Sequence, residues 1–145
     1  MPSGTTPSGT TSPTTTSPST MLRSRYVTDN VETMSPGRLV VALYDRLMLD
    51  FERAERAIDA HEIVNAHDAL VHAQDIVFAL LTNLNTAIWS AGPQLAAVYH
   101  YLLEELVRAN VSKDASYVQA CAVMVAPLRD AWREAAGIAG PALPA

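Results

Sequence analysis

The 145-residue chain has the length of one domain, and its composition excludes several classes of protein. Ten basic and fifteen acidic residues give a formal net charge of −5, which disfavours a surface for nucleic acid or anionic lipid. A single cysteine, Cys121, forms no internal disulfide, and no apolar run reaches the roughly 20 residues that span a bilayer. The composition therefore predicts a mildly acidic, cytoplasmic globular protein without a membrane span.

The first 20 residues differ from the rest of the chain, because all but Met1 are Pro, Ser, Thr or Gly. Such a segment has too few apolar side chains to offset the entropy of ordering, so we expect residues 1–20 to form a disordered tail. It also lacks the basic start and the apolar stretch of a secretory signal. Met21 offers an alternative start, and the sequence leaves open whether the tail is genuine.

Residues 22–34 form a short amphipathic segment. Its apolar side chains are Leu22, Tyr26, Val27, Val31 and Met34. They are too few to make a core alone, yet their exposure to water is unfavourable. We expect this segment to act as a gate that folds over an apolar groove of the domain, with Tyr26 as its main contact. Permanent packing as a fifth small element is the alternative.

Four stretches with helical periodicity follow. Ser35-Pro36 is a capping residue with proline at the first helical position, which predicts a helix over 36–60. Apolar residues at alternating steps of three and four predict a second helix over 62–84. Gly92-Pro93 begins a third helix, which ends near Asn110. Asp114 caps a fourth helix, which ends near Gly137.

The connections between these helices predict their arrangement. Helices joined by short connections pack as antiparallel neighbours, so the expected fold class is all-α, an antiparallel up-down-up-down four-helix bundle. Pro127 lies inside the last helix, where we expect a kink and not a break because the apolar pattern resumes in phase. The expected domain covers residues 21–136, including the segment over 22–34, and residues 137–145 are expected to be a flexible C-terminus.

The helices lack the residue patterns of metal and catalytic sites. The Glu-x-x-His pairs of a di-iron bundle do not occur, and His61-Glu62 is followed by Asn65 where a zinc-protease motif needs histidine. His67 and His72 diverge around their helix, because five residues span about 500°. Cys121 has no charged residue three or four positions away that would lower its pKa. We therefore predict no catalytic residue, no metal site and no cofactor.

The second helix carries more apolar surface than packing in a bundle requires. A second stripe beside its packing face consists of Val64, Val71, Phe78 and Leu81. Such a helix is either buried centrally or presents a groove to a partner helix, and periodicity leaves both open. Trp132, on the packing face of the last helix, is expected to be a core anchor. The pairs Tyr44-Asp45 and Gln74-Asp75 favour polar contacts at an interface over acid/base chemistry.

Several of these residues recur in a known order and spacing. They are Tyr26, the run from Val31 to Pro36, Leu39, Leu43-Tyr44-Asp45, the run from Ala73 to Val77, Leu80, Leu84-Asn85, Leu95, Tyr99, Tyr101, Leu106, Ala109-Asn110, Leu128-Arg129 and Trp132. Together they resemble the FliS family of flagellar secretion chaperones. The resemblance covers most of the chain after its Ser/Thr/Pro tail.

The resemblance implies a chaperone and not an enzyme. Such a chaperone binds the disordered C-terminal region of flagellin in the bacterial cytoplasm, prevents premature polymerisation and delivers flagellin to the flagellar export gate. The expected flagellin-binding groove consists of Tyr44, Asp45, Val64, Val71, Gln74, Asp75, Phe78, Leu81, Tyr99, Leu103 and Asn110. An all-helical small enzyme and a self-associating homodimer are the alternatives.

Overall fold

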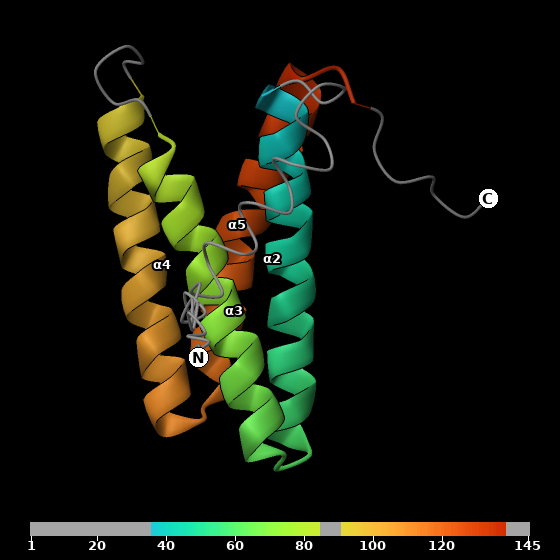
Figure 1. The fold of residues 1–145 in the computed structure, drawn as a ribbon, viewed down its shortest axis with the longest axis vertical. Coiled ribbons are helices and arrows are strands. Elements are labelled where there is room, and N and C mark those ends of the chain that lie inside the picture. The colour runs from blue at the N-terminus through green and yellow to red at the C-terminus, as the bar shows by residue number, and fades with distance from the viewer. Residues whose placement is uncertain (1–35, 85–90, 139–145) are drawn as a thin grey trace, which may run out of the picture.

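The computed structural model describes residues 36–84 and 91–138, which form four α-helices. They are α2 (Pro36–Asp59), α3 (Ile63–Thr82), α4 (Gly92–Ser112) and α5 (Ala115–Ala135). Both α2 and α4 pack against α3 and α5, and successive helices run in opposite directions (Figure 1). The expected up-down-up-down four-helix bundle is confirmed. The expected tail over 1–20, the segment over 22–34 and residues 139–145 lie outside the described residues.

The helix ends follow local signals in the sequence. Proline begins α2, and the Asp114 side chain caps α5 by accepting a hydrogen bond from the Ser116 backbone N–H at 2.9 Å. After α5, Gly137 adopts a φ of 68°, and the Ile138 N–H returns to the Arg133 carbonyl at 3.0 Å. The α5 helix continues through Pro127, as the in-phase apolar pattern predicts.

Two tight connections set the antiparallel pairs. Residues 60–62 join α2 to α3, and residues 113–114 join α4 to α5. Each connection contains one residue in the left-handed region, His61 with a φ of 56° and Lys113 with a φ of 53°. This conformation reverses the chain within a few residues, at a cost of roughly 1 to 2 kcal/mol for a residue with a side chain. Both connections therefore hold their helices side by side.

One face of each helix builds the core. Its largest fully buried apolar side chains include Leu47 and Phe51 of α2, Leu70 and Ile76 of α3, Leu102 and Leu106 of α4, and Val118 and Val125 of α5. Tyr44 and Tyr99 are buried among them, and their hydroxyls share a hydrogen bond of 2.5 Å that joins α2 to α4. The core of the described bundle therefore satisfies its polar tyrosine groups internally.

Two substitutions on α3 compare the contribution of a core side chain to stability with that of an exposed side chain on the same helix. We expect Leu70→Ala to lower the free energy of unfolding by about 2 to 5 kcal/mol, because Leu70 is fully buried and truncation leaves a cavity. Val64→Ala on the same helix should change it by no more than about 0.5 kcal/mol, because Val64 is exposed. Urea unfolding followed by circular dichroism measures both. Similar losses for the two variants would contradict the assignment.

Candidate functional site

The α3 helix exposes an apolar face that the core does not use. Val64, Val71 and Phe78 follow one another at seven-residue intervals and therefore lie on the same side of the helix. Val64 is 72% exposed and Phe78 53%, whereas Val71 is half-buried. A large aromatic side chain left this open is unusual on a small bundle whose core is already filled, and it indicates a contact surface.

The exposed apolar face continues onto α4. Asn110 Nδ2 of α4 lies 3.0 Å from His67 Nδ1 of α3, so the start of α3 and the end of α4 lie side by side. Val111, 83% exposed, and the exposed Val107 flank this contact on α4. We call the residues Val64, Val71, Phe78, Val107 and Val111 the α3–α4 surface. Its open valines and aromatic ring suit the apolar side of an amphipathic helix.

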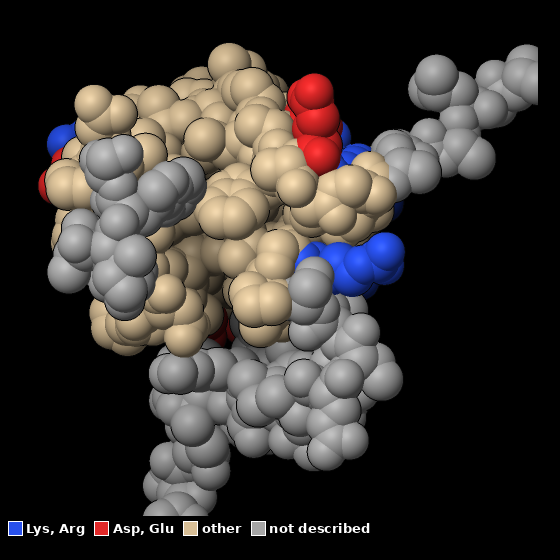
Figure 2. All heavy atoms as spheres, turned by 90° about the horizontal axis from the view of Figure 1, so that it is seen from above, with Lys and Arg blue, Asp and Glu red and all other residues tan. Residues whose placement is uncertain are grey.

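A second apolar region lies at the end of the bundle where α2 and α4 begin. A cavity of about 450 Å³ opens between α4 and α5 and is lined by Leu95, Val98 and Leu128. Another, of about 310 Å³, lies where α2 begins and α3 ends, and Pro36 and Leu84 are among its lining residues. Trp132 lines both cavities. The described part of this end shows charged side chains mainly at its rim (Figure 2).

Trp132 connects these cavities to the core. Its ring is half-buried and packs against the core residues from α5. Burial raises the pKa of Tyr44, and hydrogen bonds of Tyr44 with Tyr99 and Trp132 oppose that increase. The expected role of Trp132 as a core anchor stays a prediction. Its side chain also forms part of the wall of two open cavities.

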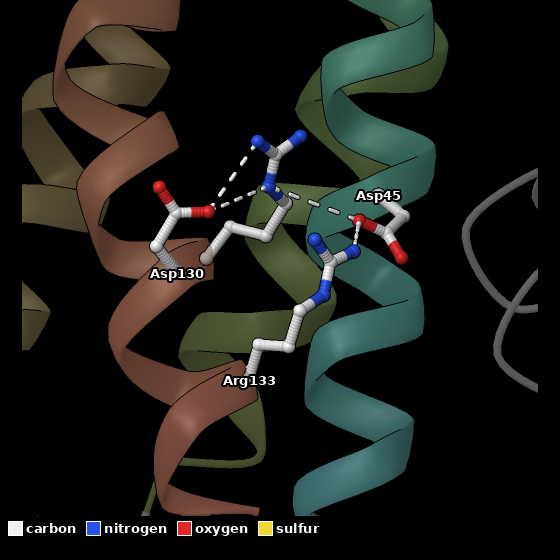
Figure 3. Close-up of polar contacts among 4 residues, drawn as sticks. Asp45, Asp130 and Arg133 are labelled. Atoms are coloured by element: carbon white, nitrogen blue, oxygen red, sulfur yellow. Dashed lines mark hydrogen bonds and ion pairs between the residues drawn. The ribbon is translucent and has the colours of Figure 1, made fainter. Parts of the chain in front are cut away.

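A cluster of ion pairs joins α2 to α5 on both sides of Trp132 along the helix. Arg133 Nη2 donates to Asp45 Oδ1 at 2.7 Å, and Arg129 Nε lies 3.9 Å from the same oxygen (Figure 3). Arg129 also pairs with Asp130 at 3.5 Å. Asp45 and Asp130 are exposed, so each contact contributes modestly to stability, and the cluster mainly fixes how the two helices meet.

The expected groove residues do not form one surface. Tyr44 and Tyr99 are buried and bonded to each other, so the structure places them in the core and leaves little of them for a partner. Asp45 is engaged with α5. The half-buried Leu81 and Leu103 pack against the core. The spacing of Tyr99 from Leu95 and Leu102 was the local signal that Tyr99 faces the core.

The remaining expected groove residues lie along α3 or at its contact with α4. Val64, Val71 and Phe78 belong to the α3–α4 surface, Gln74 is half-buried, and Asn110 contacts His67. A role for any of them in binding a partner stays a prediction. The structure therefore keeps the α3 part of the expected groove accessible and moves its tyrosines inside.

Asp75 lies on α3 between Val71 and Phe78 and lacks the cationic partners that the buried Asp50 and Glu105 have. It forms no hydrogen bond or ion pair with a described residue, and its Oδ2 atom is buried. Burial raises the pKa of the Asp75 carboxyl above its ordinary value, and the nearby His72 opposes this. A half-buried carboxylate without a donor is unfavourable for the folded chain.

The sequence reasoning missed a buried polar contact between α2 and α3. Asp50 is 1% exposed, bonds to His72 Nδ1 and lies 3.8 Å from Arg46. It lines a charged cavity of about 500 Å³, together with Arg53 and Asp68. The spacing of Asp50 beside Leu47 and Phe51 placed it at the seam, but nothing local identified a histidine 22 residues away as its partner.

Within the described ranges, no three His, Cys, Asp or Glu side chains gather as a metal site, and no helix is long and apolar enough to cross a membrane. Cys121 is fully buried, as expected of a core residue. Burial, with a smaller effect of Glu105, raises the pKa of its thiol to about 12. The thiol therefore stays protonated near neutral pH and is a poor nucleophile.

The described residues form an all-α four-helix bundle with an exposed apolar surface, and comparisons with known proteins identify its family. The family model "Flagellar protein FliS" matches residues 19–139. The flagellar secretion chaperone FliS of Bacillus subtilis (strain 168) is 30% identical over 110 residues, which cover 76% of this chain and 82% of the relative. The chain therefore belongs to the FliS family of flagellar chaperones, which are not enzymes. Its role is that of a chaperone in flagellar export.

A solved structure shares the fold. The structure titled "Crystal structure of flagellar chaperone from bacteria" has a TM-score of 0.67 to this chain at 19% sequence identity. The match covers 81% of this chain and 96% of the other. The four-helix arrangement is therefore common to both proteins despite their low identity.

Removal of the Asp75 charge should stabilise the free protein at neutral pH. Because its folded-state pKa lies above the unfolded value, the protonated carboxyl favours folding, and this stability is lost as pH rises through the folded-state pKa. We expect Asp75→Asn to have a higher free energy of unfolding than the wild type at pH 7. The difference should shrink as pH approaches the ordinary aspartate pKa of 3.8. Urea unfolding of both proteins at pH 7 and pH 4 measures it, and a variant less stable than wild type at pH 7 would refute the expectation.

Proposed function

We propose that this chain is a cytoplasmic chaperone of flagellin, and that its α3–α4 surface binds the amphipathic C-terminal region of flagellin. The single observation that carries this proposal is the exposed apolar face of α3, with Phe78 and Val64 open on a bundle whose core is already complete. Membership of the FliS family and the name of the Bacillus subtilis relative, a flagellar secretion chaperone, support it. Delivery of the bound flagellin to the export gate completes the proposed role.

The physical basis of the binding is coupled folding of a disordered segment. Ordering of an unfolded amphipathic segment has a free-energy cost of about 2 to 5 kcal/mol, which reduces its affinity. Full burial of one large apolar side chain contributes about 1.5 to 3 kcal/mol, so a few contacts with the α3–α4 surface exceed that cost. The same contacts occupy the apolar stripe that would otherwise pair with other flagellin copies. The chaperone thereby prevents polymerisation without any chemical step.

The apolar cavities beside Trp132 offer a second contact region for the same partner. Pro36 lines the smaller cavity, so the chain that precedes α2 enters the domain at this end. We expect the segment over 22–34, which lies outside the described residues, to cover this end in the free protein. A tethered segment acts at an effective concentration near millimolar, so even weak docking competes with flagellin.

Charge placed on the α3–α4 surface should abolish binding and leave the fold intact. We expect Phe78→Asp to raise the dissociation constant for a peptide of the cognate flagellin C-terminal region by at least about tenfold, because it buries a carboxylate in an apolar contact. Its melting temperature should stay close to that of the wild type, because Phe78 is half exposed. Titration calorimetry measures the affinity.

A matched variant on another helix controls for the added charge. Val123 of α5 is 76% exposed and lies outside the α3–α4 surface, so Val123→Asp should bind the peptide as the wild type does. Wild-type affinity in Phe78→Asp would contradict the proposal. Sedimentation of each free protein tests the homodimer alternative, because self-association through the same surface would also be lost in Phe78→Asp.

Deletion of the segment before α2 tests its proposed role as a gate. Removal of residues 1–34 should leave the peptide affinity unchanged or make it tighter, because the intramolecular competitor is gone. The melting temperature shows whether the segment is instead a permanent part of the fold, since loss of permanent packing lowers it. A clear loss of affinity without unfolding would contradict the gate.

A further inference from the structure

Both acidic residues that are buried in the described bundle, Asp50 and Glu105, and the interhelical Asp45 have cationic partners. Asp45 pairs with Arg133, Asp50 with His72, and Glu105 with Arg108 at 2.6 Å. Asp75 differs, because it forms no ion pair or hydrogen bond with a described residue although its Oδ2 atom is buried. It also lies within the apolar stripe, one turn from both Val71 and Phe78.

None of the Lys and Arg side chains that the structure describes forms an ion pair with Asp75. The α3 helix contains neither residue type along its whole length. On α4, Arg108 pairs with Glu105, and Lys113, which caps the helix, donates to Asn110 Oδ1 at 2.7 Å. His72, three residues before Asp75, is bonded to Asp50. On α2, which also packs against α3, Arg46 lies 3.8 Å from Asp50, so the helices around α3 leave Asp75 without a countercharge in contact with it.

We propose that Asp75 is a specificity contact for the bound flagellin segment and accepts a hydrogen bond from a Lys or Arg side chain of that segment. This inference rests on the proposed flagellin-binding function of the α3–α4 surface. A basic group would meet a carboxylate that is already partly desolvated, where charge-assisted hydrogen bonds are strong. An amphipathic helix without a basic residue at that position would leave the carboxylate buried and unpaired. The apolar contacts would then give affinity, and Asp75 would select the sequence and register of the partner.

Neutralisation of Asp75 tests this contact in the full-length protein. Asp75→Asn keeps the shape of the side chain and removes its charge. We expect its dissociation constant for the cognate flagellin C-terminal peptide to rise about fivefold at low salt, with a smaller difference at high salt, because ions screen the lost attraction. Asp68→Asn is the matched control, since Asp68 lies seven residues earlier on α3, is exposed and forms no ion pair with a described residue. It should bind within about twofold of the wild type.

A charge exchange identifies the partner residue. Asp75→Lys should bind the peptide more weakly than Asp75→Asn does, because two positive charges then face each other. Peptides in which one Lys or Arg at a time is replaced by Glu should include one that regains affinity for Asp75→Lys and loses it for the wild type. Such a reciprocal exchange is not produced by a general change of net charge.

The outcomes separate this inference from the function on which it rests. Wild-type affinity in Asp75→Asn, together with weak binding by Phe78→Asp, would overturn the specificity contact and leave the proposed function standing. An equal loss in Asp68→Asn would show only long-range attraction and would also overturn it. Absence of peptide binding by the wild-type protein would refute both proposals.

Discussion

The rest of the structure depends on the packing of its core. Each of the four helices buries one face there, around the hydrogen bond between Tyr44 and Tyr99. This packing fills the core of the described bundle and places the two tyrosine hydroxyls against each other. The exposed apolar side chains are a surplus that lies outside this core. On α3 they include Val64 and Phe78, and the function proposed for the chain follows from that surplus.

The fold was predictable from sequence because its signals are local. The Ser35-Pro36 start, the Asp114 cap and the Gly137 turn each act within a few residues, and the observed helices begin and end within about two residues of the expected bounds. The site was predictable only in part. Periodicity shows which side of a helix is apolar, but not which residue of another helix completes a polar contact. The hydrogen bond of Tyr44 to Tyr99 spans 55 residues, and that of Asp45 to Arg133 spans 88, so neither has a local signature.

In the proposed complex, the surface divides affinity from specificity. Valine and phenylalanine side chains on α3 and α4 accept any apolar helix face of suitable width, because hydrophobic burial is not directional. A carboxylate without a partner, Asp75, adds the directional contact that such a surface lacks. A chaperone also has to release its cargo. The free-energy cost of ordering the cargo lowers the net affinity and therefore favours release. The ion pairs of Asp45 with α5 meanwhile fix how α2 and α5 meet beside the cavities at Trp132.

The central claim is that an unfolded flagellin segment folds onto an apolar surface of this chain. Its most direct test is the heat-capacity change of binding, measured by calorimetry of the full-length protein with the cognate flagellin C-terminal peptide at several temperatures. The account predicts a large negative value, which corresponds to the burial of about 1,000 to 3,000 Å² on coupled folding and binding. A heat-capacity change near zero, with an affinity that falls steeply with salt, would contradict it and indicate an electrostatic contact between preformed surfaces.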